Sequence, residues 1–123
     1  MKTTNSVMKF PKAERIYLQK EIEELFTPGN AKGITNYPIR MVYRYVTRED
    51  ESEPRVKVLI SVAKKRLHRA VDRVRAKRQM REAYRLNKPS CERTANIALV
   101  WLANEPQESR LVHEKIKELL SKL

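Results

Sequence analysis

RAVDRVRAKRQMREAYRLNK, residues 69–88, has the repeat of a helix with two different sides. At about 100° per residue, four side chains fall together as a face that can pack on a core: Ala76, Met80, Ala83 and Tyr84. Four others fall together on another side, and we call them the basic face: Lys77, Arg78, Arg81 and Arg85. Like charges spaced by three or four residues repel each other by a few tenths of a kcal/mol per pair, so the pattern favours an anionic partner.

The positive charge of the chain is concentrated around this helix. Between residues 64 and 85, ten Lys and Arg residues are opposed only by Asp72 and Glu82, which places +8 of the formal net charge of +12 in 22 residues. A solvated helix face with no partner normally mixes both signs. The charge therefore predicts binding to a polyanion, with nucleic acid favoured over a membrane surface.

Length and composition set the broad class. The 123 residues suit one domain, residues 1–123, in which we expect residues 1–8 to be mobile. No apolar run approaches the roughly 18 residues of a membrane span, and the opening MKTTNSVMKF lacks a signal-peptide core. A single cysteine, Cys91, excludes an internal disulfide and a cysteine-rich zinc site. We expect a soluble, cytoplasmic protein.

Five further elements are predicted around the basic helix. They are a helix from Pro11 to Phe26, strands over 37–46, 55–62 and 96–103, and a last helix from about Pro106, capped by Asn104 or Glu105. The second strand should run antiparallel to the first, and the apolar third strand is typical of burial on both faces. The order α-β-β-α-β-α predicts an α/β (α+β) two-layer sandwich with a small mixed sheet.

Val74 does not fit a simple amphipathic pattern. It lies at about 300° when Val71 is set to zero, within the basic face and nearly opposite the core-facing side. Either Val74 faces the partner of the basic face, or a shifted helix start turns it into the core.

The helix closely resembles the signature helix of the bacterial ribonuclease P protein component. The matching positions are Arg73, Arg75, Lys77, Arg78, Arg81, Glu82, Tyr84 and Arg85. The strand that runs into Lys64 and Lys65, the opening helix and the C-terminal strand and helix also match the family in order. This chain departs from the family at two places. The family usually has Asn where this chain has Val74, and the segment that leads into the helix commonly contains Gly in the family but reads RLHR (66–69) here.

The resemblance implies a function. Ribonuclease P is a ribonucleoprotein endoribonuclease that removes the 5′ leader of precursor tRNA. Its RNA carries the active site, so no catalytic residue is expected in this chain, and Mg²⁺ is held mainly by that RNA. The implied partners are the catalytic RNA and precursor tRNA, with no DNA and no membrane. The implied fold is the ribosomal protein S5 domain 2-like fold, whose βαβ crossover is left-handed, against the general rule.

The resemblance also implies two sites. The catalytic RNA would be bound by Lys64, Lys65, Arg69, Arg73, Val74, Arg75, Lys77, Arg78, Arg81 and Arg85. The leader would lie in a cleft between the first helix and the sheet, at Ile22, Phe26 and Tyr43. Stacking on aromatic side chains suits a single strand because it is tolerant of sequence. Plain core packing of Phe26 and Tyr43 is the alternative.

Two other functions remain open on the residues alone. A ribosomal-RNA-binding or ribosome assembly protein without a catalytic role would have a similar composition. A DNA-binding helix fits less well, because a strand and not a short helix and turn precedes the basic helix. His68 and His113 lie on separate elements, and no His/Cys motif that would hold a metal surrounds them.

Overall fold

The computed structural model describes residues 12–48, 53–89 and 92–123. The elements in chain order are η1 (Lys12–Glu14), α2 (Gln19–Phe26), β1 (Lys32–Asn36), β2 (Ile39–Tyr45), β3 (Val56–Ser61), α3 (Ala70–Leu86), β4 (Ala95–Trp101) and α4 (Ser109–Leu120). The expectations for residues 1–8, for Pro11 and for Cys91 lie outside the described residues.

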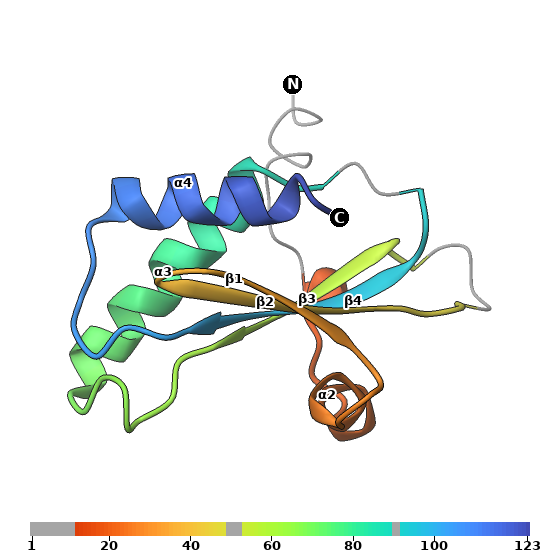
Figure 1. Ribbon diagram of the computed structural model, residues 1–123, viewed down its shortest axis with the longest axis horizontal. Helices are drawn as coiled ribbons and strands as arrows, with labels where there is room; N and C mark the ends of the chain where they lie inside the picture. The colour runs from red at the N-terminus through yellow and green to blue at the C-terminus, as the bar shows by residue number, and fades with distance from the viewer. Residues whose placement is uncertain (1–11, 49–52, 90–91) are drawn as a thin grey trace.

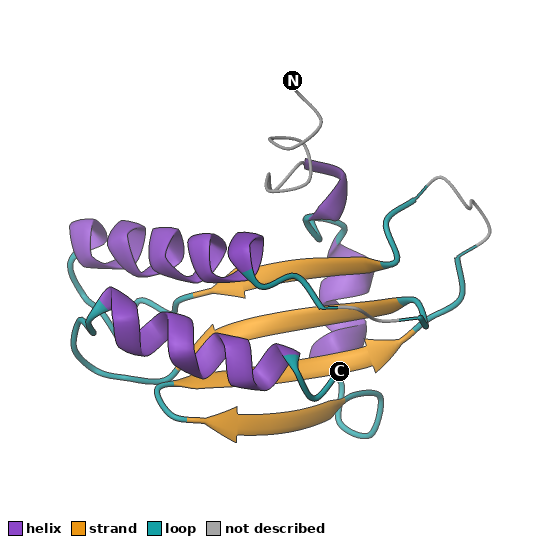
Figure 2. Cartoon of the chain, turned by 90° about the horizontal axis from the view of Figure 1, so that it is seen from above, coloured by secondary structure: helices purple, strands orange, loops and turns teal. Residues whose placement is uncertain are grey.

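The four strands form one mixed sheet in the order β1-β2-β4-β3 (Figure 2). Strands β1 and β2 are antiparallel, β2 and β4 are antiparallel, and β3 and β4 are parallel. Helices α3 and α4 cover one face of the sheet, and α2 lies against the opposite face (Figure 1). The mixed α/β fold predicted from the sequence is confirmed, with α2 adding a partial layer on the second face. The handedness of the β3–α3–β4 crossover stays a prediction.

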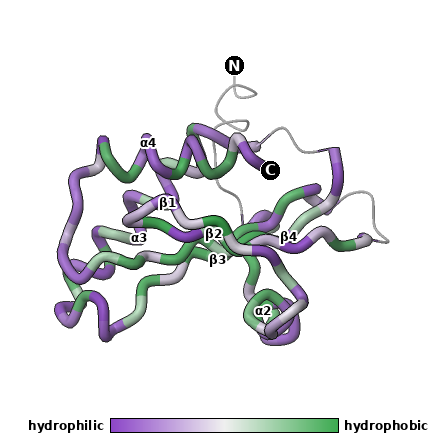
Figure 3. The backbone as a smooth tube through the Cα atoms, in the orientation of Figure 1, coloured by the Kyte–Doolittle hydropathy of each residue, from purple (hydrophilic) through white to green (hydrophobic). Residues whose placement is uncertain are grey.

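The main core lies between the sheet and the helix pair α3 and α4. Met41, Leu99 and Trp101 project from neighbouring strands and pack with Met80 of α3 and Ile116 of α4, all with at most 1% of their surface exposed. Hydrophobic and hydrophilic stretches alternate along α4 (Figure 3). Burying each such side chain contributes about 1.5–3 kcal/mol, so this layer holds α3 in place and fixes which side faces outward.

A smaller core lies under α2. Leu25 packs with Ile16, Val42 and Ala98, all buried, on the face of the sheet opposite to α3. Strand β4 is therefore buried on both faces, as its continuous apolar sequence predicts. Arg44 of β2 forms an ion pair with Glu24 of α2 at 3.3 Å, which adds a polar contact at this interface.

Strand β1 was not predicted. Its sequence KGITN is short and polar, and it lies in the stretch between the predicted first helix and the strand over 37–46, where no element was predicted. It forms because β2 offers a free edge, to which residues 32–36 pair in antiparallel register. Strand β3 does run opposite to β2, as expected, but the two are not neighbours because β4 lies between them.

Both terminal helices are shorter than predicted. The first helix does not run from residue 11, because Ile16 leaves the helical path and its N–H donates to the carbonyl of Val58 at 3.0 Å, at the edge of β3. The last helix does not begin at Pro106. The side-chain amide of Gln79 donates to the carbonyl of Gln107 and to the hydroxyl of Ser109. These contacts hold residues 107–109 against α3, and the helix begins only at Ser109.

Candidate nucleic-acid interface

Helix α3 presents the two sides that its sequence predicts. Four residues of the inner side are buried: Ala76, Met80, Ala83 and Tyr84. On the outer side, Arg75, Arg78 and Arg81 are exposed, and Lys77 and Arg85 are partly exposed. The same packing that buries Met80 therefore turns the guanidinium groups toward solvent. Lys64, Lys65 and Arg69, which precede the helix, are also exposed.

Val74 lies on the outer side. Its side chain is 48% exposed and that of Val71 is 61% exposed, so the interpretation of Val74 as a core residue is wrong. The two valines form a small apolar area bordered by Arg75 and Arg78 on the same helix. The position that is usually Asn in the family therefore faces outward here, where a partner of the basic face would contact it.

The substitution Val74→Asn tests this placement. We expect the free energy of unfolding to change by less than about 0.5 kcal/mol, as for other exposed positions without special contacts. We expect the affinity for the catalytic RNA to be kept or raised, because an amide can donate and accept hydrogen bonds that valine cannot. Urea denaturation and RNA titration measure the two quantities. A clear loss of affinity would show that the RNA contacts the valine methyl groups themselves.

Two of the predicted RNA-binding arginines also make contacts within the protein. The guanidinium of Arg73 is partly buried and donates to the carbonyls of Leu67 and His68, both at 2.8 Å, so it braces the turn before α3. Arg85 is paired with Glu82 one turn away, a contact that lowers the pKa of the Glu82 carboxyl and raises that of the Arg85 guanidinium. Arg75, Arg78 and Arg81 are the more exposed candidates for phosphate contacts.

The predicted leader cleft is only partly assembled as expected. Ile22 is partly buried against the small core, and Phe26 is 48% exposed at the end of α2, so these two residues share a surface. Tyr43 does not join them. It packs against the main core, on the face of the sheet opposite to its neighbour Val42, because successive side chains of a strand alternate between faces.

Two arginines that the site prediction left out, Arg40 and Arg44, lie on the α2 side of the sheet. Arg40 is exposed, and its guanidinium lies so close to Gly33 of the neighbouring strand that a Cβ at Gly33 would clash with Nη2. Arg44 lies two residues further along the same face. The alternation of side chains along β2 could have predicted their position, because it places Arg40, Val42 and Arg44 on one face of the sheet and Tyr43 on the other.

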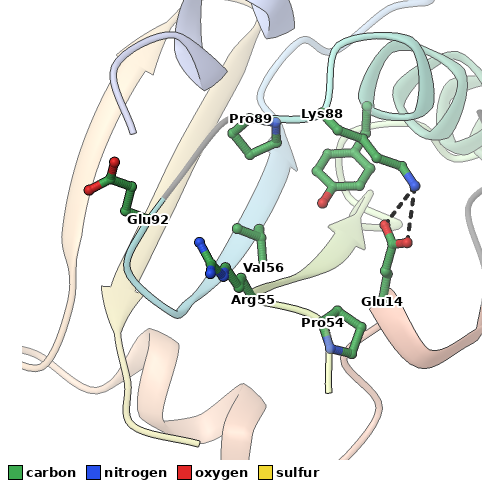
Figure 4. Close-up of a pocket in the computed structure, with 8 residues that line it drawn as sticks. Glu14, Pro54, Arg55, Val56, Lys88, Pro89 and Glu92 are labelled. Atoms are coloured by element: carbon green, nitrogen blue, oxygen red, sulfur yellow. Dashed lines mark hydrogen bonds and ion pairs between the residues drawn. The ribbon is translucent and has the colours of Figure 1, made fainter. Parts of the chain in front are cut away.

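A hollow of about 480 Å³ lies at the C-terminal end of α3, lined by Glu14, Pro54, Arg55, Val56, Tyr84, Lys88, Pro89 and Glu92 (Figure 4). Lys88 and Glu14 form an ion pair at one side of it at 2.9 Å, which ties η1 to the end of α3 (Figure 4). Burial raises the pKa of the Tyr84 phenol, and the nearby charge of Glu14 adds to this effect. Both signs of charge line this hollow, so it does not continue the basic face.

The described side chains offer no ready place for a metal ion. Among residues 12–48, 53–89 and 92–123, no three His, Cys, Asp or Glu side chains gather as a set of ligands. Within the same ranges, no helix has the length and apolar character needed to cross a membrane. What the described surface does offer is exposed cationic groups on α3 and, on the other face of the sheet, a mixed apolar and basic surface beside α2.

These features define a small basic α/β protein of the RNA-binding class. The family model for ribonuclease P matches residues 10–123. The ribonuclease P protein component of Porphyromonas gingivalis strain W83 is 42% identical over 122 residues, covering 91% of this chain and 84% of that protein. The chain therefore belongs to the ribonuclease P protein family.

Solved structures agree on the fold. The ribonuclease P protein of Thermotoga maritima superposes with a TM-score of 0.70 at 23% identity, covering 89% of this chain and 97% of that one. The Staphylococcus aureus protein gives a TM-score of 0.70 at 19% identity, covering 90% and 95%. Members of this family act in the 5′ processing of tRNA as part of ribonuclease P. By this membership the chain is a component of an endoribonuclease holoenzyme and has an RNA partner there.

Proposed function

We propose that the chain binds the catalytic RNA of ribonuclease P through the outer side of α3 and the 5′ leader of precursor tRNA beside α2. The observation that carries this proposal is the exposure of Arg75, Arg78 and Arg81 on the side of α3 opposite to its buried residues. Guanidinium groups make forked contacts with phosphate, and such contacts position an RNA more than they read its sequence. We further propose that the protein acts in the cytoplasm.

The two RNA sites lie on different faces of the sheet. Helix α3 packs on one face, and α2 lies on the other (Figure 1). Arg40 and Arg44 share the α2 side of β2 with Val42, because side chains alternate along a strand. One molecule can therefore hold the catalytic RNA and the leader at once without competition between them. Phe26 supplies an exposed ring for stacking, and Arg40 supplies a cation on the same side of the sheet.

The chemistry belongs to the RNA in this proposal. The described residues offer no clustered ligands for Mg²⁺, and the outer side of α3 is cationic, so the metal would be held by the catalytic RNA. The contribution of the protein is to bind both RNAs and to offset the repulsion between their phosphates. A lower requirement for Mg²⁺ follows, because protein cations replace part of the counterion atmosphere.

Cleavage of a precursor tRNA at low Mg²⁺ tests the proposed function. The reaction is run with the catalytic RNA alone, with the protein alone and with both. We expect cleavage at the mature 5′ end only when both are present, while the RNA alone is shown to be competent at high Mg²⁺. If the protein gives no gain with a competent RNA, the proposal fails, and binding to ribosomal RNA becomes the function to test.

A further inference from the structure

Helix α2 contacts the sheet through little apolar surface. Leu25 is the buried residue among its eight residues, and it packs with Ile16, Val42 and Ala98, while Ile22 is only partly buried. A helix that packs on a core usually buries an apolar stripe of roughly three or four residues in two turns, and such a stripe fixes its rotation about its own axis. The apolar contacts of α2 are fewer, so other contacts must set its rotation.

A row of polar residues crosses the sheet on the α2 side, next to this small core. Three residues at the same level of neighbouring strands form the row: Arg44 of β2, Asn96 of β4 and Lys57 of β3. They lie two residues along the strands from Val42 and Ala98 of the small core, so they face α2 as well. Asn96, in the middle of the row, is only 3% exposed. A buried amide is stable where its hydrogen bonds are satisfied.

Asn96 connects α2 to the sheet through two hydrogen bonds. Its Oδ1 accepts from Nη2 of Arg48 at 2.9 Å, and its Nδ2 donates to Oε2 of Glu21 on α2 at 3.3 Å. Arg48 also donates to the carbonyls of Pro54 and Ala95, at 2.9 and 3.0 Å, so it is held by the backbone before β3 and at the start of β4. The chain of contacts from Arg48 through Asn96 to Glu21 therefore joins α2 to a fixed part of the sheet.

The two carboxylates that bind the sheet lie on one flank of α2. With Leu25 toward the sheet, Glu21 and Glu24 fall about 40° and 100° to one side of it. Ile22 and Phe26 fall about 60° and 100° to the other side. Glu24 adds an ion pair at 3.3 Å with an arginine of β2. A rotation of α2 moves the two flanks in opposite directions, so the contacts of the carboxylates also determine how far the ring of Phe26 stands out from the sheet.

We propose that Asn96 is a positioning residue, which fixes the rotation of α2 through Glu21 and so orients Phe26 for the precursor tRNA. The proposal rests on the proposed function of the surface beside α2 and names the residues that orient this surface. It predicts the opposite of a simple charge effect. Removing a carboxylate near RNA should raise the affinity, because like charges repel. Removing the carboxylate that holds α2 in place should lower it.

The test measures the ratio of the affinities of the holoenzyme for a precursor tRNA and for the mature tRNA. Glu21→Ala should lower this ratio at least about fivefold, the lower end for the loss of one stacked base. Glu21→Gln should retain the ratio, because its amide oxygen can still accept from Asn96. Glu23→Ala is the matched control, since it removes the same charge from the exposed side of α2, and it should retain or raise the ratio.

A double variant tests whether the two residues act through one contact. Asn96→Ala should also lower the ratio, and combining it with Glu21→Ala should lower the ratio no further than the larger single effect. Because Asn96 is buried and Glu21 is partly exposed, the Glu21 variants still decide the question if Asn96→Ala does not fold. Binding of the catalytic RNA should be unchanged in every folded variant, because α3 lies on the other face of the sheet.

Three outcomes would overturn the proposal. They are a ratio that Glu21→Ala leaves unchanged or raises, an equal loss in Glu21→Gln, and a parallel loss of catalytic RNA binding that would indicate general unfolding. A failure of the proposed function would look different, because the wild-type holoenzyme would then bind precursor and mature tRNA equally well.

Discussion

The triple substitution Lys77→Ala, Arg78→Ala and Arg81→Ala should weaken binding of the catalytic RNA about 100-fold at 0.15 M salt. The three side chains lie on the outer side of α3. For each phosphate contact that is lost, about one counterion fewer is released from the RNA when the protein binds. The slope of log K against log salt should therefore fall by about one for each residue. Filter binding or fluorescence titration across a range of salt concentrations measures both quantities.

A charge-matched control separates specific contacts from net charge. Arg110, Lys117 and Lys122 are exposed on or just after α4, and their replacement by alanine removes the same three charges from another surface. We expect this control to change the affinity and the salt slope far less. Neither triple variant should unfold, because alanine has a high helix propensity and the first variant relieves repulsion within α3. Equal losses in both variants would mean that only the net charge matters.

The two sides of α3 could be predicted from sequence because the 3.6-residue repeat of the helix determines both the buried and the exposed positions. Once Met80 and Tyr84 face the core, the position of Arg81 on the outer side follows from helix geometry alone. The exposure of Val74 follows from the same geometry, which is why the residue stood out as unusual. The contacts of Arg73 with Leu67 and His68 could not be predicted, because they depend on the path of the turn before the helix.

The leader cleft was harder to predict because it depends on which side of a strand faces which helix. Alternation groups Arg40, Val42 and Arg44, but it does not say whether α2 or α4 covers that group. The contact of Val42 with Leu25 settles this, and it places Tyr43 on the opposite side. An assignment carried over from a family resemblance can be wrong by one residue, and in a strand an error of one residue changes the face.

The element boundaries that were missed share a physical cause. Ile16 is not helical because its N–H donates a hydrogen bond to the edge strand β3. Helix α4 begins later than predicted because the side chain of Gln79 donates hydrogen bonds to Gln107 and Ser109. Strand β1 forms because the edge of β2 is free. In each case the partner lies far along the chain, so the local sequence does not carry the signal. Tertiary contacts of this kind override local propensity.

Met80→Ala should lower the free energy of unfolding by about 2–5 kcal/mol, the range for truncating a fully buried large side chain. Met80 is 0% exposed and lies in the main core, so its removal leaves a cavity under α3. For a chain of this size the midpoint of thermal unfolding should fall by roughly 10 °C or more. Urea denaturation and calorimetry measure the loss, with Val74→Ala on the outer side of the same helix as the control, expected to change stability by less than about 0.5 kcal/mol.

The decisive comparison is between stability and RNA affinity in the same variants. Below its unfolding transition, Met80→Ala should bind the catalytic RNA nearly as well as the wild-type protein, because the basic side chains are unchanged. Saturating RNA should raise its unfolding midpoint, since a ligand that binds only the folded state stabilises it. The triple variant of the outer side should show the reverse, with normal stability and weak binding. If Met80→Ala lost affinity while still folded, RNA binding would depend on the packing of α3 as well as on its exposed charges.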